Sequence, residues 1–131
     1  MAIDTRELSL DLQRALPFIE QAFAELAPSG FAVEYTEGRE CFGHKFWSLH
    51  HSGNAVDVRT KTLPDKGVGQ ESLRICRSIQ EKLDRTFGKN SYLTLWNDRG
   101  IRQPHIHVQY NRGTRQSAPV DVPPVGRARL A

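Results

Sequence analysis

Histidine and aspartate occur in two short stretches with a spacing that suits metal binding. In the first, SLHHSGNAVD, His50 and His51 precede Asp57 by seven and six residues. In the second, PHIHV, His105 and His107 are two residues apart, so in a β-strand both would project from the same face. Imidazole nitrogens and carboxylate oxygens are ligands of zinc and of other transition metals. The two stretches therefore predict a metal site.

Strand alternation predicts how these residues meet. Residues 55–59 (AVDVR) are expected to form a strand whose valines face the core while Asp57 projects oppositely. A neighbouring strand over 104–110 would bring one of its two histidines to Asp57. His50 can reach the same point from the preceding loop, where Gly53 allows a sharp turn. Two imidazoles and a carboxylate with an open fourth position form a catalytic zinc site, but iron(II) accepts the same set, so the ligands alone do not name the metal.

Hydrophobic periodicity predicts the elements that hold these residues. Apolar residues at steps of three and four predict one helix over 5–27 and another from Leu73 to Phe87, ending at Gly88. Pro17 lies inside the first pattern and either kinks that helix or opens a second one. Alternating residues predict strands over 31–35, 55–59, 92–96 and 104–110, the last two joined by a hairpin turn. This order predicts an α+β domain with helices packed on one face of a mainly antiparallel sheet.

The composition limits the class of protein. The chain has 131 residues, of which 38% are hydrophobic and 25% charged, as is typical of one compact domain. No apolar run reaches the length of a membrane span, and the N-terminus lacks the features of a signal peptide. We therefore expect synthesis in the cytoplasm and no membrane partner. The two cysteines are too few for a disulfide framework.

The positive charge is concentrated at the C-terminus. Residues 112–131 contain four arginines, one aspartate and three prolines, so they carry the whole net charge of +3. We expect a single domain over 1–111, with its metal-site core over 31–110, followed by a basic, extended tail over 112–131. The tail could contact a virion component or another subunit. The body is neutral and has no recognition motif, so we expect no nucleic-acid partner.

The first histidine stretch resembles the signature of a known enzyme family. Ser48-x-His50-x-x-Gly53-x-Ala55-x-Asp57 is similar, at every fixed position, to the signature of the zinc D-Ala-D-Ala carboxypeptidases. That family includes phage and bacterial peptidoglycan endopeptidases and shares its fold with the hedgehog signalling domain. The PHIHV stretch is similar to short, phage-type members. The resemblance covers residues 31–110 and implies the hedgehog/DD-peptidase fold.

The resemblance also implies a role for each matching residue. His50, Asp57 and His107, the second histidine of His-x-His, would bind one zinc ion. His105 would be the nearby histidine that does not bind the metal and instead stabilises the reacting centre or moves a proton.

The sequence departs from the family at one position. Many members have a glutamate or aspartate three residues before the last histidine ligand as the general base, and here that residue is Pro104. Three alternatives follow: His105 takes the role, Asp98 reaches in from the hairpin loop, or the protein has lost activity. His105 is the first choice because it shares a strand face with His107.

Three further residues are candidates for contacts with the substrate or with a ligand. The hydroxyl of Ser48 could orient a ligand or bind substrate, and the guanidinium of Arg59 could pair with a carboxylate or an oxyanion. Arg39 is a weaker candidate for the same task. For all three, a surface or structural role is an equally good interpretation. His44, His51 and Cys41 receive no role from either pattern.

These observations favour a zinc-dependent peptidase that hydrolyses peptide bonds in peptidoglycan stem peptides or cross-links, related to a phage or prophage. Such an enzyme would act at the cell wall as a phage lytic or virion protein. The alternative is a virion or binding module of the same fold that keeps the metal but does not catalyse hydrolysis.

Overall fold

The computed structural model describes residues 4–37, 53–97 and 104–111. Arg39, Ser48, His50 and Asp98 lie outside these ranges, as do Cys41, His44, His51 and the tail over 112–131. The elements follow one another as η1 (Thr5–Glu7), α1 (Leu10–Leu26), β1 (Tyr35–Glu37), β2 (Ala55–Arg59), α2 (Gln70–Phe87), β3 (Tyr92–Asn97) and β4 (His105–Tyr110).

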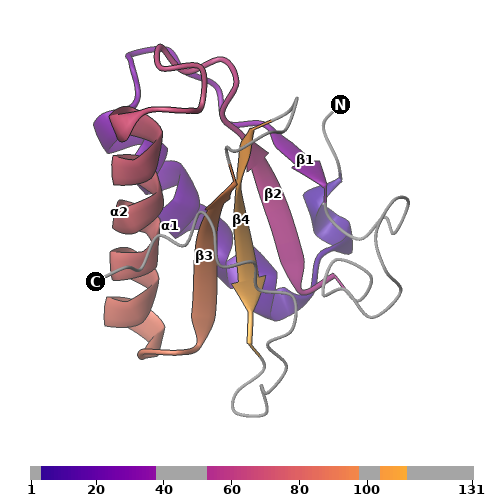
Figure 1. Cartoon of the computed structure of the whole chain (residues 1–131). Coiled ribbons are helices and arrows are strands. Elements are labelled where there is room, and N and C mark those ends of the chain that lie inside the picture. The colour runs from indigo at the N-terminus through magenta and orange to yellow at the C-terminus, as the bar shows by residue number, and fades with distance from the viewer. Residues whose placement is uncertain (1–3, 38–52, 98–103, 112–131) are drawn as a thin grey trace.

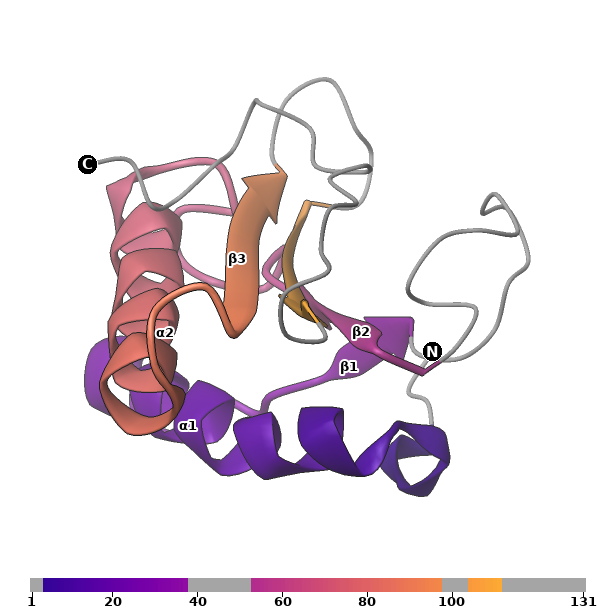
Figure 2. The same cartoon turned by 90° about the horizontal axis from the view of Figure 1, so that it is seen from below.

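The described strands form one antiparallel sheet with the order β1-β2-β4-β3. Both long helices pack against the same face of it (Figures 1 and 2). The predicted α+β class and the predicted arrangement of helices on one face are therefore confirmed. Strand β4 lies between β2 and β3, which places its histidines near the middle of the sheet rather than at an edge.

The N-terminal helical region is divided at Ser9. A single helix over 5–27 was the expectation, but the chain forms η1, breaks at Leu8 and begins α1 at Leu10. The reason is a side-chain cap: the Ser9 hydroxyl accepts a hydrogen bond from the backbone N–H of Leu12, at 3.2 Å. Helix α1 then continues through Pro17 to Leu26, so Pro17 does not open a second helix.

The first strand lies later in the chain than expected. The alternation over 31–35 predicted a strand there, but β1 covers Tyr35–Glu37. Phe31 and Val33 pack against the core without joining the sheet. Their alternation shows that every second side chain is apolar, and such side chains can be buried without the backbone pairing to a strand. Strand β2 covers 55–59 as predicted, and α2 ends before Gly88, whose φ of 100° is readily adopted only by glycine. Helix α2 begins at Gln70, three residues before the predicted Leu73, because its first turn is polar and does not show in the apolar periodicity.

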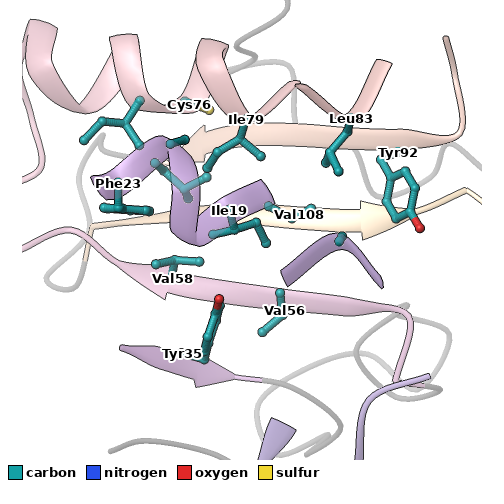
Figure 3. Close-up of a cluster of buried hydrophobic side chains, with 14 of the residues drawn as sticks. Ile19, Phe23, Tyr35, Val56, Val58, Cys76, Ile79, Leu83, Tyr92 and Val108 are labelled. Atoms are coloured by element: carbon teal, nitrogen blue, oxygen red, sulfur yellow. The ribbon is translucent and has the colours of Figure 1, made fainter. Parts of the chain in front are cut away.

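The hydrophobic core fills the space between the helices and one face of the sheet (Figure 3). Val56, Val58 and Val108 project from the strands toward Ile19 and Ile79 of the helices. All five are fully buried, and burial of each stabilises the fold by about 1.5–3 kcal/mol. Because side chains alternate along a strand, their neighbours in sequence must project from the opposite face.

The edge strand β3 is covered by a side chain from α2. The amide of Gln80 donates to the carbonyl oxygen of Tyr92, at 2.9 Å, and accepts from the N–H of Thr94, at 2.8 Å. Gln80 is 4% exposed, so these backbone groups are removed from water and paired by one side chain. Gln80 thus pairs two backbone groups on the outer edge of the sheet, as a further strand would.

Asp65 organises the loop between β2 and α2. Its carboxylate accepts hydrogen bonds from the N–H groups of Gly67, Gly69 and Ser72 and from the hydroxyl of Ser72. Partial burial raises the pKa of Asp65, but these donors together outweigh burial and leave the pKa below its ordinary value. The carboxylate therefore fixes both the loop and the beginning of α2.

This loop also holds the beginning of β4. The N–H of Thr60 donates to the carbonyl oxygen of Pro104, at 3.2 Å, and the indole N–H of Trp96 donates to the carbonyl oxygen of Gly67, at 3.0 Å. Gly67 lies so close to Thr60 and Pro104 that a Cβ there would be 2.6 Å and 2.9 Å from their side chains. The loop thus fixes the chain immediately before His105.

None of the helices in the described ranges has the length and apolar character that crossing a membrane requires.

Candidate metal centre

The strand register places Asp57 opposite His107. In the antiparallel pair of β2 and β4, Asp57 pairs with His107 and Arg59 pairs with His105. All four side chains project from the face of the sheet opposite the helices, because Val56, Val58 and Ile106 occupy the helix-covered face. The structure thus brings Asp57 together with both strand histidines, although about fifty residues of sequence separate Asp57 from them.

The Asp57 carboxylate lies between the two imidazole rings. Its Oδ1 is 3.0 Å from Nδ1 of His107, and its Oδ2 is 3.6 Å from Nε2 of His105. The Asp57 side chain is 7% exposed, against 18% for His107 and 21% for His105. The carboxylate is therefore at the base of the site, and the two rings have more access to solvent.

Two neighbours of this cluster on the same face are apolar and buried, Leu95 and Ala55. Leu95 of β3 pairs with His107 across the ladder and is 2% exposed. Ala55, two residues before Asp57, is fully buried. A carboxylate in such surroundings interacts strongly with nearby charge, since little water is present to screen it.

One residue of the first stretch, Gly53, has a structural reason for its identity. Gly53 has a φ of 80°, and a Cβ there would lie 3.2 Å from backbone atoms of Glu7 and Ser9, so only glycine fits without strain. The carbonyl oxygen of Gly53 accepts from the N–H of Ser9, at 2.9 Å. The sharp turn expected at Gly53 is present, and it anchors the entrance of β2 against the start of α1.

The ring of His107 has a partner on its other nitrogen, which the sequence reasoning missed. Nε2 of His107 is 2.9 Å from Oε1 of Gln109, and Nε2 of Gln109 donates to Oδ1 of Asn111, at 3.0 Å. Alternation along β4 puts Gln109 on the face of the histidines, and this is the signal that could have found it. Nothing in the sequence indicates the contact between amide and ring.

The arrangement of Asp57 and His107 fits a zinc ion chemically. With Zn–N and Zn–O bonds of about 2.1 Å and tetrahedral angles, two ligand atoms lie about 3.4 Å apart. The observed 3.0 Å between His107 Nδ1 and Asp57 Oδ1 is close to that separation. Within residues 4–37, 53–97 and 104–111, no group of three or more histidine, cysteine, aspartate or glutamate side chains is arranged to hold a metal. The expected third ligand, His50, lies outside these ranges.

Arg59 is tied to a carboxylate at the edge of the site. Its Nη1 lies 3.4 Å from Oε1 of Glu34, and the N–H of Arg59 donates to the carbonyl oxygen of Glu34, at 2.9 Å. Arg59 pairs with His105 across the ladder, so its guanidinium lies on the histidine face of the sheet. The other two candidates for substrate contacts, Ser48 and Arg39, lie outside the described ranges, as does Asp98, the alternative base.

The chain was compared with protein-family models, with curated proteins and with solved structures, and none of them matches it. The functional proposal therefore depends on the residues and on the geometry described above.

Proposed function

We propose that the protein is a zinc-dependent peptidase that hydrolyses peptide bonds in peptidoglycan stem peptides or cross-links, with a hedgehog/DD-peptidase type of fold. The observation that carries the proposal is the carboxylate of Asp57 between two imidazoles, 3.0 Å from His107 and 3.6 Å from His105. The resemblance of the first stretch to the D-Ala-D-Ala carboxypeptidase signature supplies the substrate class.

The proposed division of labour follows from burial and position. Asp57 and His107, with His50, would hold one zinc ion, since they supply a carboxylate oxygen and two imidazole nitrogens. When bound, zinc lowers the pKa of a coordinated water toward about 7 and polarises the carbonyl of the scissile peptide. The ring of His105 shares the face of His107 and is the more exposed of the two. His105 would therefore take the proton from the attacking water and deliver it to the leaving amine.

The position of Pro104 supports His105 in this role over a carboxylate at the family's usual place. Pro104 is buried, its carbonyl oxygen is bonded to Thr60, and its ring packs against Gly67, so it has a structural task before β4. A carboxylate three residues before His107 would displace that packing. Arg59, on the same face, would then pair with a substrate carboxylate or with charge developing at the reacting carbonyl.

Two variants, compared with the wild type, test the assignment. Purified wild type, His107→Ala and His105→Ala are analysed for bound zinc by mass spectrometry and for release of new amino groups from peptidoglycan. We expect His107→Ala to lose both zinc and turnover. We expect His105→Ala to keep zinc and to lose turnover by about 10²–10⁴-fold, because proton transfer by a positioned side chain contributes that much.

The outcomes separate the possibilities. Full zinc occupancy without turnover on any type of cell wall would contradict the enzymatic proposal. Loss of zinc in His105→Ala but not in His107→Ala would reverse the ligand assignment.

The absence of a carboxylate at position 104 also favours a second candidate function, a virion or binding module that holds zinc without hydrolysis. This module would bind peptidoglycan and leave its peptides intact. Co-sedimentation with cell walls, measured beside amino-group release, distinguishes it from the peptidase. In either case the protein would act at the cell wall as a phage-related component, and the tail over 112–131 would contact neighbouring subunits.

A further inference from the structure

We propose that Asn97 is a substrate-binding residue whose side-chain amide pairs with the main chain of an extended peptide lying beside His105. The inference rests on the proposed function for the identity of that peptide, a peptidoglycan stem peptide. Neither the sequence patterns nor the family resemblance gives Asn97 a role. Binding of the peptide can be measured whether or not the protein hydrolyses it.

The sheet aligns three polar side chains in one row across its histidine face. Strand β4 lies between β2 and β3, and His105 pairs with Arg59 on one side and with Asn97 on the other (Figure 1). Directly opposite residues of antiparallel strands have Cα atoms about 4.5–5.5 Å apart, and their side chains project from the same face. The Arg59 guanidinium and the Asn97 amide therefore lie on either side of the His105 ring.

This row is more open to solvent than the rows behind it. All three of its members are partly exposed. In the adjacent row, Asp57 and Leu95, on either side of His107, are buried. Gln109, in the row after that, is buried as well. A bound peptide would therefore approach the proposed metal ligands from the exposed row.

The two sides of His105 differ in what their side chains already bind. On one side, Nη1 of Arg59 lies 3.4 Å from Oε1 of Glu34, so the guanidinium is tied to a carboxylate. On the other side, the Asn97 amide makes no hydrogen bond to any described residue. A partly exposed amide of this kind is bonded to water, which a ligand with matching groups can displace. The donor and the acceptor of Asn97 are therefore available to a peptide.

Gln80 shows, within the same protein, what a side-chain amide does with an extended chain. Its nitrogen donates to the carbonyl oxygen of Tyr92, and its oxygen accepts from the N–H of Thr94, two residues later. Every extended peptide presents this pair of groups along one edge, because alternate residues point their backbone groups to the same side. Asn97 has the same terminal amide, so it can bind a peptide in the same way.

This mode of binding sets a requirement on the substrate. The contact joins the carbonyl oxygen of one residue and the N–H of the second residue after it, so the peptide must supply three consecutive residues. An amide that contacts only main-chain groups fixes the direction and register of the peptide without selecting its side chains. The contact would hold one peptide unit of an extended chain next to His105, and such positioning contributes to the rate as well as to the affinity.

A binding experiment tests the role of Asn97. The ¹⁵N-labelled protein is titrated with a synthetic stem pentapeptide, and the side-chain amide signal of Asn97 is assigned by its loss in Asn97→Leu. We expect this signal to shift on binding. Asn97→Leu has a similar volume without polar groups and should raise Kd about tenfold, since two hydrogen bonds are lost. Gln21→Leu removes an exposed amide from α1 and should leave Kd unchanged.

Modified peptides distinguish a direct contact from a structural role. In a series of pentapeptides, each peptide N–H in turn is replaced by an ester oxygen, which cannot donate. We expect one replacement to weaken binding to wild type by several-fold, and the same replacement to have no effect in Asn97→Leu. A structural role for Asn97 would instead leave the penalty of every ester the same in both proteins.

The outcomes separate this inference from the proposed function. No binding of the pentapeptide by wild type, an unchanged Kd in Asn97→Leu, or equal ester penalties in both proteins would overturn the inference. Peptide binding that depends on Asn97 without amino-group release would support the inference and refute the peptidase. Amino-group release with an unchanged KM in Asn97→Leu would overturn the inference and leave the peptidase intact. If Asn97→Leu fails to fold, Asn97→Asp, which keeps an acceptor but loses the donor, takes its place and should raise Kd by several-fold.

Discussion

Removal of the Asp65 carboxylate should destabilise the protein by an amount that depends on which of its hydrogen bonds are lost. Its two oxygens accept four bonds, from Gly67, Gly69 and, twice, Ser72, at 2.7–3.2 Å. Gly67 and Ser72 are buried, and a buried backbone donor left unpaired costs about 1–3 kcal/mol. Because Asp65 is half-buried, water can replace part of the loss. We therefore expect Asp65→Ala to lower the free energy of unfolding by about 3 kcal/mol.

The isosteric variant Asp65→Asn should cost less, about 1–2 kcal/mol. The amide nitrogen of the asparagine can take the place of Oδ1. There it can donate to the Ser72 hydroxyl, which in the wild type donates to Oδ1. Only the N–H of Gly67 then loses its partner. Urea unfolding at neutral pH measures both variants through their midpoints at unchanged slope. Glu71→Gln removes the same charge from the first turn of α2 and should change stability by at most about 0.5 kcal/mol.

The pH dependence of the unfolding free energy tests whether the charged Asp65 carboxylate stabilises the fold. The pKa of Asp65 in the folded protein is below its ordinary value, so its contribution to stability is present above the unfolded-state pKa and is lost as the pH falls through the folded-state pKa. The stability difference between wild type and Asp65→Asn should thus be largest near neutral pH and should shrink below about pH 4. A difference that is independent of pH, or equal losses in Asp65→Ala and Asp65→Asn, would refute the reasoning.

Three further predictions test the site and its supports. Asp57→Asn keeps the volume but removes the charge of the proposed zinc ligand. Zinc affinity should therefore fall by at least about 100-fold in a chelator competition while the circular dichroism stays unchanged. Wild-type affinity in this variant would exclude Asp57 as a ligand. Gln80→Leu leaves two buried backbone groups of β3 unpaired and should lower the free energy of unfolding by about 2–4 kcal/mol, as measured by urea unfolding. A loss below about 0.5 kcal/mol would show that water replaces the amide as the partner of these groups. Gly53→Ala and Gly30→Ala both place a side chain at positive φ, at a cost of about 1 kcal/mol. Gly53→Ala should cost about 1 kcal/mol more in thermal unfolding, because a Cβ there meets backbone at 3.2 Å and one at Gly30 meets nothing within 4 Å; equal costs would contradict the close approach.

The fold class followed from local patterns of the sequence. Hydrophobic periodicity indicates which side chains face the core, as it does from Leu73 to Phe87 and in residues 55–59 and 104–110. The fold class follows because the tertiary structure must bury these apolar faces. The same alternation placed Asp57, His105 and His107 together on the opposite face. Local patterns failed where a single polar contact decided the outcome, as at Ser9, whose cap divides the N-terminal helix.

The sequence by itself determined the class of fold, the face of each strand and the set of candidate ligands, because each depends on residue type and on spacing within one element. Only the tertiary structure decided the register that pairs Asp57 with His107 and the chain of amides that joins His107, through Gln109 and Asn111, to the turn at Asn90. These contacts join residues from different strands and from a distant turn. Their geometry is set by packing of the whole sheet against the helices, which no local pattern records.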